Sequence, residues 1–148
     1  MFKRARKNDN NLNVAISNNS KKIKFYYRKK INMLNTINKK FAKNSFKKGF
    51  KTGSIQSQTL NSILNKSKFK NKKIDFLNID VEGNEINALE SFNLKKYSPK
   101  LICIEIHNNT SGRNTKDYFK KDPIYKFLCK KNYKYIWNNE FSYIFRVK

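Results

Sequence analysis

Two short apolar runs separated by one helix constrain the fold of this 148-residue chain more than any other feature. Residues 74–79 and 101–106 are nearly continuous in apolar side chains, as strands buried in a parallel sheet are. Between them, residues 84–91 carry Ile86 and Leu89 at helical spacing, and Pro99 stops the helix from continuing. We therefore expect two adjacent parallel strands joined by a right-handed crossover helix.

The other patterns extend this unit into an α/β domain. Residues 133–147 alternate apolar and polar side chains around a turn, which predicts an antiparallel hairpin at the sheet edge. Thr59 and the Asp122-Pro123 pair predict the starts of two more helices. Nearer the start, alternation over residues 12–17 and an apolar run at 23–27 predict another hairpin, and residues 55–57 a short strand. The stretch 28–53 is expected to be a long loop with a short helix.

The whole chain has a net charge of +24, from 34 basic and 10 acidic residues. The positive charge is concentrated in its first half. Residues 1–73 hold 21 lysines and arginines against one acid, and residues 74–148 hold 13 against nine. Such charge can bind nucleic-acid phosphates. However, 29 lysines, 23 asparagines and only five arginines are also what AT-rich codons produce, and arginine makes the better bidentate contacts. Nucleic-acid binding is therefore the less favoured interpretation.

Several classes of protein are excluded by what the sequence lacks. No apolar run approaches the ~18 residues of a membrane span, and the basic start has no apolar signal segment after it. Cys103 and Cys129 have no metal-ligand spacing and lie in apolar patterns, so we expect them to be core residues. These features predict a cytoplasmic protein with no membrane partner.

Six of the ten acids lie between residues 75 and 105, close to where the two predicted strands end. Ligands of open parallel sheets bind beyond the carboxyl ends of the strands. Asp80 and Glu82 follow the first strand, and Glu105 and His107 end the second, so these four can converge. They could orient a hydroxyl, act as a general base or hold a divalent cation. Structural alternatives stay open: Asp80 could cap the next helix, Glu82 and Glu85 could complement its dipole, and His107 could be structural.

The residues around this edge resemble the FkbM family of S-adenosylmethionine-dependent methyltransferases. Residues 74–85 read IDFLNIDVEGNE, where the family pattern is I-D-x-L-K-I-D-V-E-G-x-E, and Asn78 replaces the usual lysine. A helix, a proline and the run Ile102-Cys103-Ile104-Glu105 follow, which resembles the family's P-x-I-x-x-E segment. The similarity covers most of residues 10–148 and is specific over 74–107.

The resemblance implies a class I methyltransferase fold, a mostly parallel Rossmann-like sheet that ends in an antiparallel hairpin. It implies S-adenosylmethionine as cofactor and O-methylation of a hydroxyl on a sugar, glycan or secondary metabolite. The catalytic candidates are Asp80, Glu82, Glu105 and His107, with Asp80 orienting the substrate or a metal and His107 acting as general base. The resemblance leaves a metal requirement open.

The chain departs from the family at its start. The family opens with a strand and a glycine-rich turn that holds the cofactor, followed by a second strand ending in an acid. This chain has four glycines and no close pair of them after a strand, and residues 14–17 match the family's third strand. We therefore expect residues 1–10 to be a disordered or interrupted start, and residues 11–148 to be a partial domain lacking the first two strands.

No residue can be assigned to cofactor binding on this basis. The alternatives to an active, truncated enzyme are a non-catalytic remnant or a partner subunit, which a separate N-terminal chain could complement.

Overall fold

The apolar runs form the centre of a four-stranded sheet in the computed structural model, which describes residues 2–29, 33–107 and 118–148. β4 (Phe76–Ile79) and β5 (Leu101–Glu105) pair in parallel, with Phe76 opposite Leu101. Between them lie α4 (Glu85–Glu90) and α5 (Leu94–Tyr97). The parallel pair with a helical crossover, expected from the sequence, is therefore confirmed.

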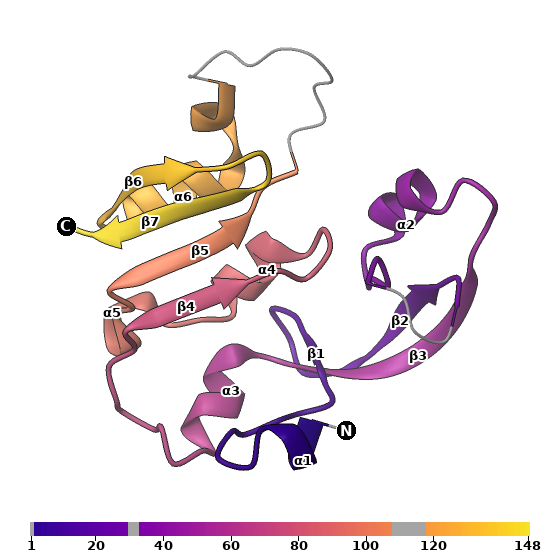
Figure 1. Ribbon diagram of the computed structural model, residues 1–148, viewed down its shortest axis with the longest axis horizontal. Helices are drawn as coiled ribbons and strands as arrows, with labels where there is room; N and C mark the ends of the chain where they lie inside the picture. The colour runs from indigo at the N-terminus through magenta and orange to yellow at the C-terminus, as the bar shows by residue number, and fades with distance from the viewer. Residues whose placement is uncertain (1, 30–32, 108–117) are drawn as a thin grey trace.

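The predicted closing hairpin is also confirmed. β6 (Tyr133–Asn138) and β7 (Ser142–Val147) pair antiparallel, and β7 pairs antiparallel with β5. The strand order is β4-β5-β7-β6, so the hairpin places β6 at the edge of the sheet (Figure 1). The fold is α/β with mixed sheets.

One large hydrophobic core holds this sheet and its helices together. Ile102 and Ile104 of β5 are fully buried, as alternate residues on one face of a strand are. Leu89 of α4 and Leu128 of α6 (Pro123–Lys130) are buried in the same cluster. The Asp122 carboxylate accepts a hydrogen bond from the backbone N–H of Ile124 at 2.8 Å, so the predicted start of this helix is confirmed. A 3-10 helix, η1 (Tyr118–Lys121), precedes it.

A second sheet of three strands corrects the hairpin expected from residues 12–17 and 23–27. β1 (Ala15–Ile16) and β2 (Lys22–Tyr27) do not form a hairpin with each other. Both pair with β3 (Lys51–Gln58), β1 in parallel and β2 antiparallel, so β3 is the central strand. The buried Ser57 hydroxyl helps to fix this order, because it donates to the carbonyl oxygen of Lys21, at 2.8 Å, in the connection between β1 and β2.

Three further helices lie among the described residues of the first half of the chain. α1 (Phe2–Ala5) is a single turn, and α2 (Lys39–Ser45) is the short helix expected within residues 28–53. α3 (Leu60–Asn65) begins after Thr59, whose hydroxyl accepts from the N–H of Ser62 at 3.0 Å, as predicted. Among the helices of the described residues, none combines the length and the apolar character needed to cross a membrane.

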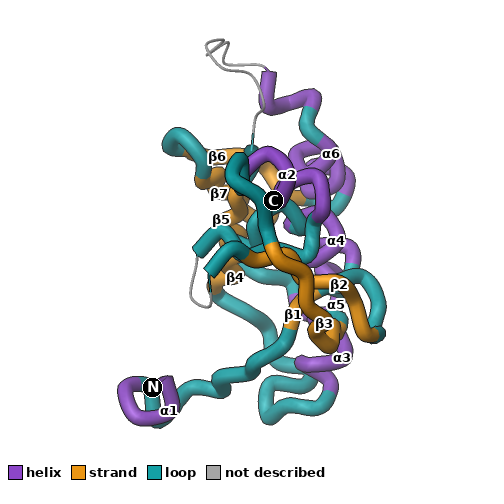
Figure 2. The backbone as a smooth tube through the Cα atoms, turned by 90° about the vertical axis from the view of Figure 1, so that its right-hand side faces the viewer, coloured by secondary structure: helices purple, strands orange, loops and turns teal. Residues whose placement is uncertain are grey.

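Polar contacts join the two sheets. The Asn84 side chain donates to the carbonyl oxygen of Ile16 at 2.8 Å, and the Thr36 hydroxyl donates to that of Glu82 at 2.6 Å. The Asn38 side chain donates to the carbonyl oxygen of Gly83. These bonds bring α2, which contacts β2 and lies above β2 and β3 in Figure 2, against the loop that follows β4. The arrowheads of β4 and β5 point toward α2 in Figure 1, so α2 faces their carboxyl ends.

Candidate active site at the carboxyl ends of β4 and β5

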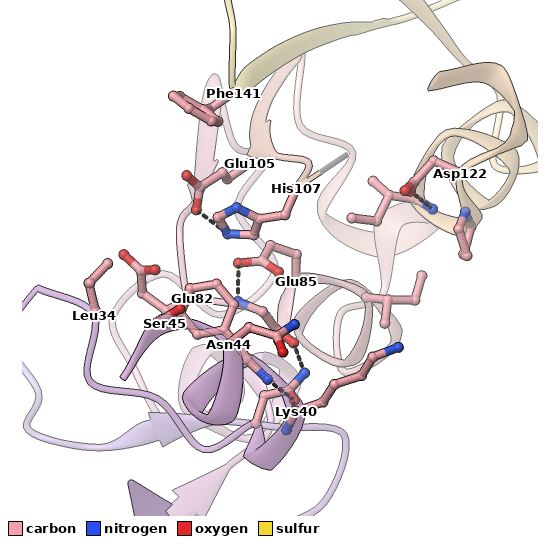
Figure 3. Close-up of a pocket in the computed structure, with 16 residues that line it drawn as sticks. Leu34, Lys40, Asn44, Ser45, Glu82, Glu85, Glu105, His107, Asp122 and Phe141 are labelled. Atoms are coloured by element: carbon pink, nitrogen blue, oxygen red, sulfur yellow. Dashed lines mark hydrogen bonds and ion pairs between the residues drawn. The ribbon is translucent and has the colours of Figure 1, made fainter. Parts of the chain in front are cut away.

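A cavity of about 610 Å³ lies at this edge and is lined by three of the four residues predicted from the sequence. Glu82 comes from the loop after β4, and Glu105 and His107 come from the end of β5 and the residues after it. Phe41 of α2 supplies one apolar wall. Phe141 of the β6–β7 turn supplies another (Figure 3). The structure therefore brings Glu82, Glu105 and His107 together in one cavity.

Asp80, the fourth predicted residue, lies at the margin. It is exposed and does not line the cavity, but its charge acts on the carboxyl groups of Glu82 and Glu105. It does not cap the following helix, because α4 begins at Glu85 with Asn84 at the N-cap position. The structural alternative considered for Asp80, capping of the next helix, is therefore not observed.

The loop after β4 has an unusual backbone that places Glu82 in the cavity. Glu82 and Gly83 have φ angles of 54° and 88°, a left-handed conformation that costs energy for a residue with a side chain. The buried Glu85 carboxylate stabilises this turn, since its Oε1 accepts hydrogen bonds from the backbone N–H groups of Val81 (3.2 Å) and Gly83 (3.0 Å). Glu85 is therefore a structural residue of the site.

Glu105 and His107 lie directly against each other in the cavity. Glu105 Oε2 and His107 Nε2 are 2.9 Å apart (Figure 3), and the side chains are 18% and 30% exposed. The two atoms are not aligned as a hydrogen bond, and within the described part of the chain each is buried without a hydrogen-bond partner. The imidazole ring packs against Phe41 with ring centroids 5.0 Å apart, which restricts its orientation.

Negative charge accumulates in and around the cavity, where the carboxyl groups of Asp80, Glu82, Glu85 and Glu105 lie close enough to act on one another. Burial, followed by the charges of Asp80 and Glu85, raises the pKa of Glu82 to about 7. Burial, followed by the charge of Asp80 and then those of Glu82 and Glu85, also raises the pKa of Glu105 to about 7. Among the described residues, no lysine or arginine forms an ion pair with any of these four carboxylates. The carboxyl groups of Glu82 and Glu105 can therefore gain or lose a proton near neutral pH.

The described residues do not fit S-adenosylmethionine. A nucleotide-type cofactor needs a glycine turn after a strand, where the backbone can approach the ligand. Gly49 and Gly83 are the described glycines with positive φ, and only Gly83 follows a strand. A Cβ placed on Gly83 would lie 2.9 Å from Cβ and Cδ2 of Phe41, so the protein itself fills that space. Gly112 lies outside the described residues.

Sequence reasoning missed the residues that α2 contributes to the cavity. Asn38, Lys40 and Phe41 line it, yet residues 28–53 gave no indication of a site. The available signal is Asn38, a residue type that is common at helix N-caps. In the structure its side chain accepts hydrogen bonds from the backbone N–H groups of Lys40 and Phe41. That signal locates the helix but not the surface on which it docks.

Comparison with known protein families places these residues in context. The model of the methyltransferase FkbM domain matches residues 2–135, which is most of the chain, and confirms the resemblance found at residues 74–107. Comparisons with curated proteins and with solved structures gave no significant match.

Proposed function

Since the chain belongs to the FkbM methyltransferase domain family, we propose that it takes part in the O-methylation of a hydroxyl on a sugar, glycan or secondary metabolite. The observation that carries this proposal is the convergence of Glu82, Glu105 and His107 in one cavity. Carboxylates and a neutral imidazole accept hydrogen bonds, and a polyhydroxylated acceptor offers many donors. The cavity size also suits a small molecule or the end of a glycan.

In this proposal the described residues act on the methyl acceptor. Its hydroxyl enters the cavity and donates to the acidic cluster, and Asp80 at the margin orients it. His107 Nε2 takes the hydroxyl proton as general base, a role that contributes about 10²- to 10⁴-fold to such reactions. Glu105, 2.9 Å from that nitrogen, stabilises the imidazolium formed. Phe41 and Phe141 provide flat apolar surfaces for the acceptor and exclude water.

The family implies S-adenosylmethionine as the methyl donor, but the described residues do not form its binding cradle. This misfit supports a second candidate, a non-catalytic or partner subunit that holds the acceptor while another chain binds the donor. The two candidates differ in one measurable property. The enzyme transfers methyl groups alone, whereas the partner subunit binds acceptors alone and transfers methyl groups only when a complementing N-terminal chain is added.

The test is a methyl-transfer assay with radiolabelled S-adenosylmethionine and a panel of sugars and glycans, with and without such a chain. His107→Ala should lower turnover about 10²-fold or more. Asp80→Asn should lower it about tenfold, because a misplaced acceptor reacts slowly. Glu90→Gln is the matched control, since it removes an exposed carboxylate of α4 outside the cavity. Wild-type turnover in His107→Ala and Asp80→Asn, at equal folded concentration, would remove the catalytic assignment.

A further inference from the structure

We propose that Glu82, Glu105 and His107 bind a divalent transition-metal cation, Mn²⁺ or Zn²⁺. The binding itself is independent of the reaction. Its consequence for the acceptor hydroxyl rests on the proposed function.

The geometry of the three side chains fits one cation. Each offers a ligand atom, and these atoms all lie within 4.8 Å of one another. Two ligands at right angles around a cation, with bonds of about 2.1 Å, are about 3.0 Å apart. Glu105 Oε2 and His107 Nε2 are 2.9 Å apart, as neighbouring ligands would be. The Glu82 carboxylate lies within 4.8 Å of both atoms, and a rotation of its half-buried side chain would bring it into the same shell.

Two of the three proposed ligand atoms have no hydrogen-bond partner among the described residues. Glu105 Oε2 and His107 Nε2 are buried and, among the residues that the structure describes, have no hydrogen-bond partner. Buried polar atoms without a partner are uncommon and call for an explanation, of which a bound ion is one. If each atom directs a lone pair at one shared cation, neither atom lacks a partner. The shared cation also explains why the two atoms approach each other closely without the alignment of a hydrogen bond.

The charge of the site points in the same direction. The cluster gathers the carboxylates of Asp80, Glu82, Glu85 and Glu105. Within the described ranges, only that of Glu85 accepts hydrogen bonds from backbone N–H groups. Lys40 also lines the cavity, but it forms no ion pair with these acids. A divalent cation would offset the mutual repulsion of the carboxylates.

The donor set selects the class of metal. Mg²⁺ and Ca²⁺ favour sites made of oxygen atoms alone, whereas an imidazole nitrogen beside carboxylates suits Mn²⁺ or Zn²⁺. Phe41 packs on the His107 ring and holds it in place, which favours a preformed site. His107 is the only histidine of the chain, so this nitrogen ligand has no substitute elsewhere.

A bound cation changes how the site would handle the acceptor. Held by Glu82, Glu105 and His107, a divalent cation would supply Lewis-acid polarisation of the acceptor hydroxyl and would lower the pKa of that hydroxyl, as metal ions do for water. The O–H bond would break with its electrons left on oxygen, and the proton would pass to solvent water. His107 would then serve as a ligand and not as the base.

The test is titration of tag-free protein with Mn²⁺, followed by the EPR signal of the free ion and by NMR of the single imidazole. Mn²⁺ is the better probe because the two free cysteines could bind Zn²⁺ separately. One Mn²⁺ should bind per chain, and it should broaden the His107 resonances of the wild-type protein at stoichiometric amounts. Glu82→Gln, Glu105→Gln and His107→Ala should each weaken binding at least tenfold, and Glu90→Gln should change it less than twofold.

The NMR arm needs no variant, so it keeps the proposal testable if a substitution unfolds the protein. Absence of His107 broadening at millimolar Mn²⁺, or unchanged affinity in Glu105→Gln and His107→Ala, would overturn the cation site. Methyl transfer with and without EDTA separates the two proposals. If the cation binds and no acceptor is methylated, the cation site stands and the proposed function is contradicted. If methyl transfer occurs, EDTA does not affect it and no cation binds, the proposed function stands and the cation site is contradicted.

Discussion

Replacing Gly83 by alanine tests how tightly α2 is docked on the loop that shapes the cavity. Gly83 has φ +88°, and a Cβ there would lie 2.9 Å from Phe41 Cβ and Cδ2. The left-handed backbone costs alanine about 1–2 kcal/mol, and inserting a methyl group into a packed site costs roughly 1–3 kcal/mol more. Phe41 Cβ is fixed to the helix backbone, so no rotation of the side chain relieves the contact. We expect Gly83→Ala to destabilise the fold by about 3 kcal/mol, a fall in Tm of roughly 6–12 °C.

Gly49→Ala is the matched control for this substitution. Gly49 has nearly the same φ, +87°, but a Cβ there would meet nothing within 4 Å. Its loss should therefore show the backbone cost alone, about 1–2 kcal/mol. Urea and thermal denaturation followed by circular dichroism give both values, and their difference isolates the contact between Phe41 and Gly83. If the two variants are equally stable, α2 is not packed on Gly83 as described, and the cavity loses one wall.

Three further predictions concern the cofactor, the hairpin and the core. Calorimetric titration of the chain alone with S-adenosylmethionine should show weak binding or none, since Phe41 fills the space at Gly83; low-micromolar affinity would show that the cofactor cradle lies elsewhere. The buried Tyr133 hydroxyl donates to the Pro99 carbonyl at 2.8 Å, and burial raises the pKa of Tyr133 to about 12. The folded state therefore keeps this proton longer than the unfolded state does, and the stability it contributes is present below pH 10 and lost between about pH 10 and 12. Tyr133→Phe should cost about 1 kcal/mol at pH 8 and less at pH 11 by urea unfolding, and an unchanged gap at the two pH values would contradict this reasoning. Ile104→Ala, at a fully buried position of β5, should cost about 2–5 kcal/mol in the same assay; a loss under 1 kcal/mol would mean that the core collapses around the change.

The sheet around β4 and β5 was predictable because its signals are local and agree with one another. Two apolar runs with a helix between them have few other stable arrangements, and the alternation of Tyr133 and Tyr135 with polar residues marks a hairpin. The cavity followed from the same reasoning. Once the strands are parallel, their carboxyl ends meet, and Glu82, Glu105 and His107 follow those ends in the sequence.

The pairing of β1 and the docking of α2 could not be predicted for a physical reason. Alternation in residues 12–17 specifies which face of a strand is apolar, but it does not specify the partner strand. The choice depends on the Ser57 hydroxyl, 36 residues away from Lys21 in sequence. In the same way, α2 is held by Thr36 and Asn38 donating to backbone carbonyls, and such acceptors exist at every residue.

The two hydrophobic clusters of the described residues differ greatly in size, and the smaller one supports a wall of the cavity. Tyr26, Ala42 and Phe46 are the buried residues around α2, against fifteen in the main core. Segments with little apolar burial open locally far more often than the rest of a protein. Amide hydrogen exchange should therefore be faster in β2, α2 and β3 than in β5 and β7. Each opening event separates Phe41 from Gly83 and admits solvent to the acidic cluster. The residence time of an acceptor in the cavity would then depend on the local unfolding equilibrium of a segment that contains none of the acids.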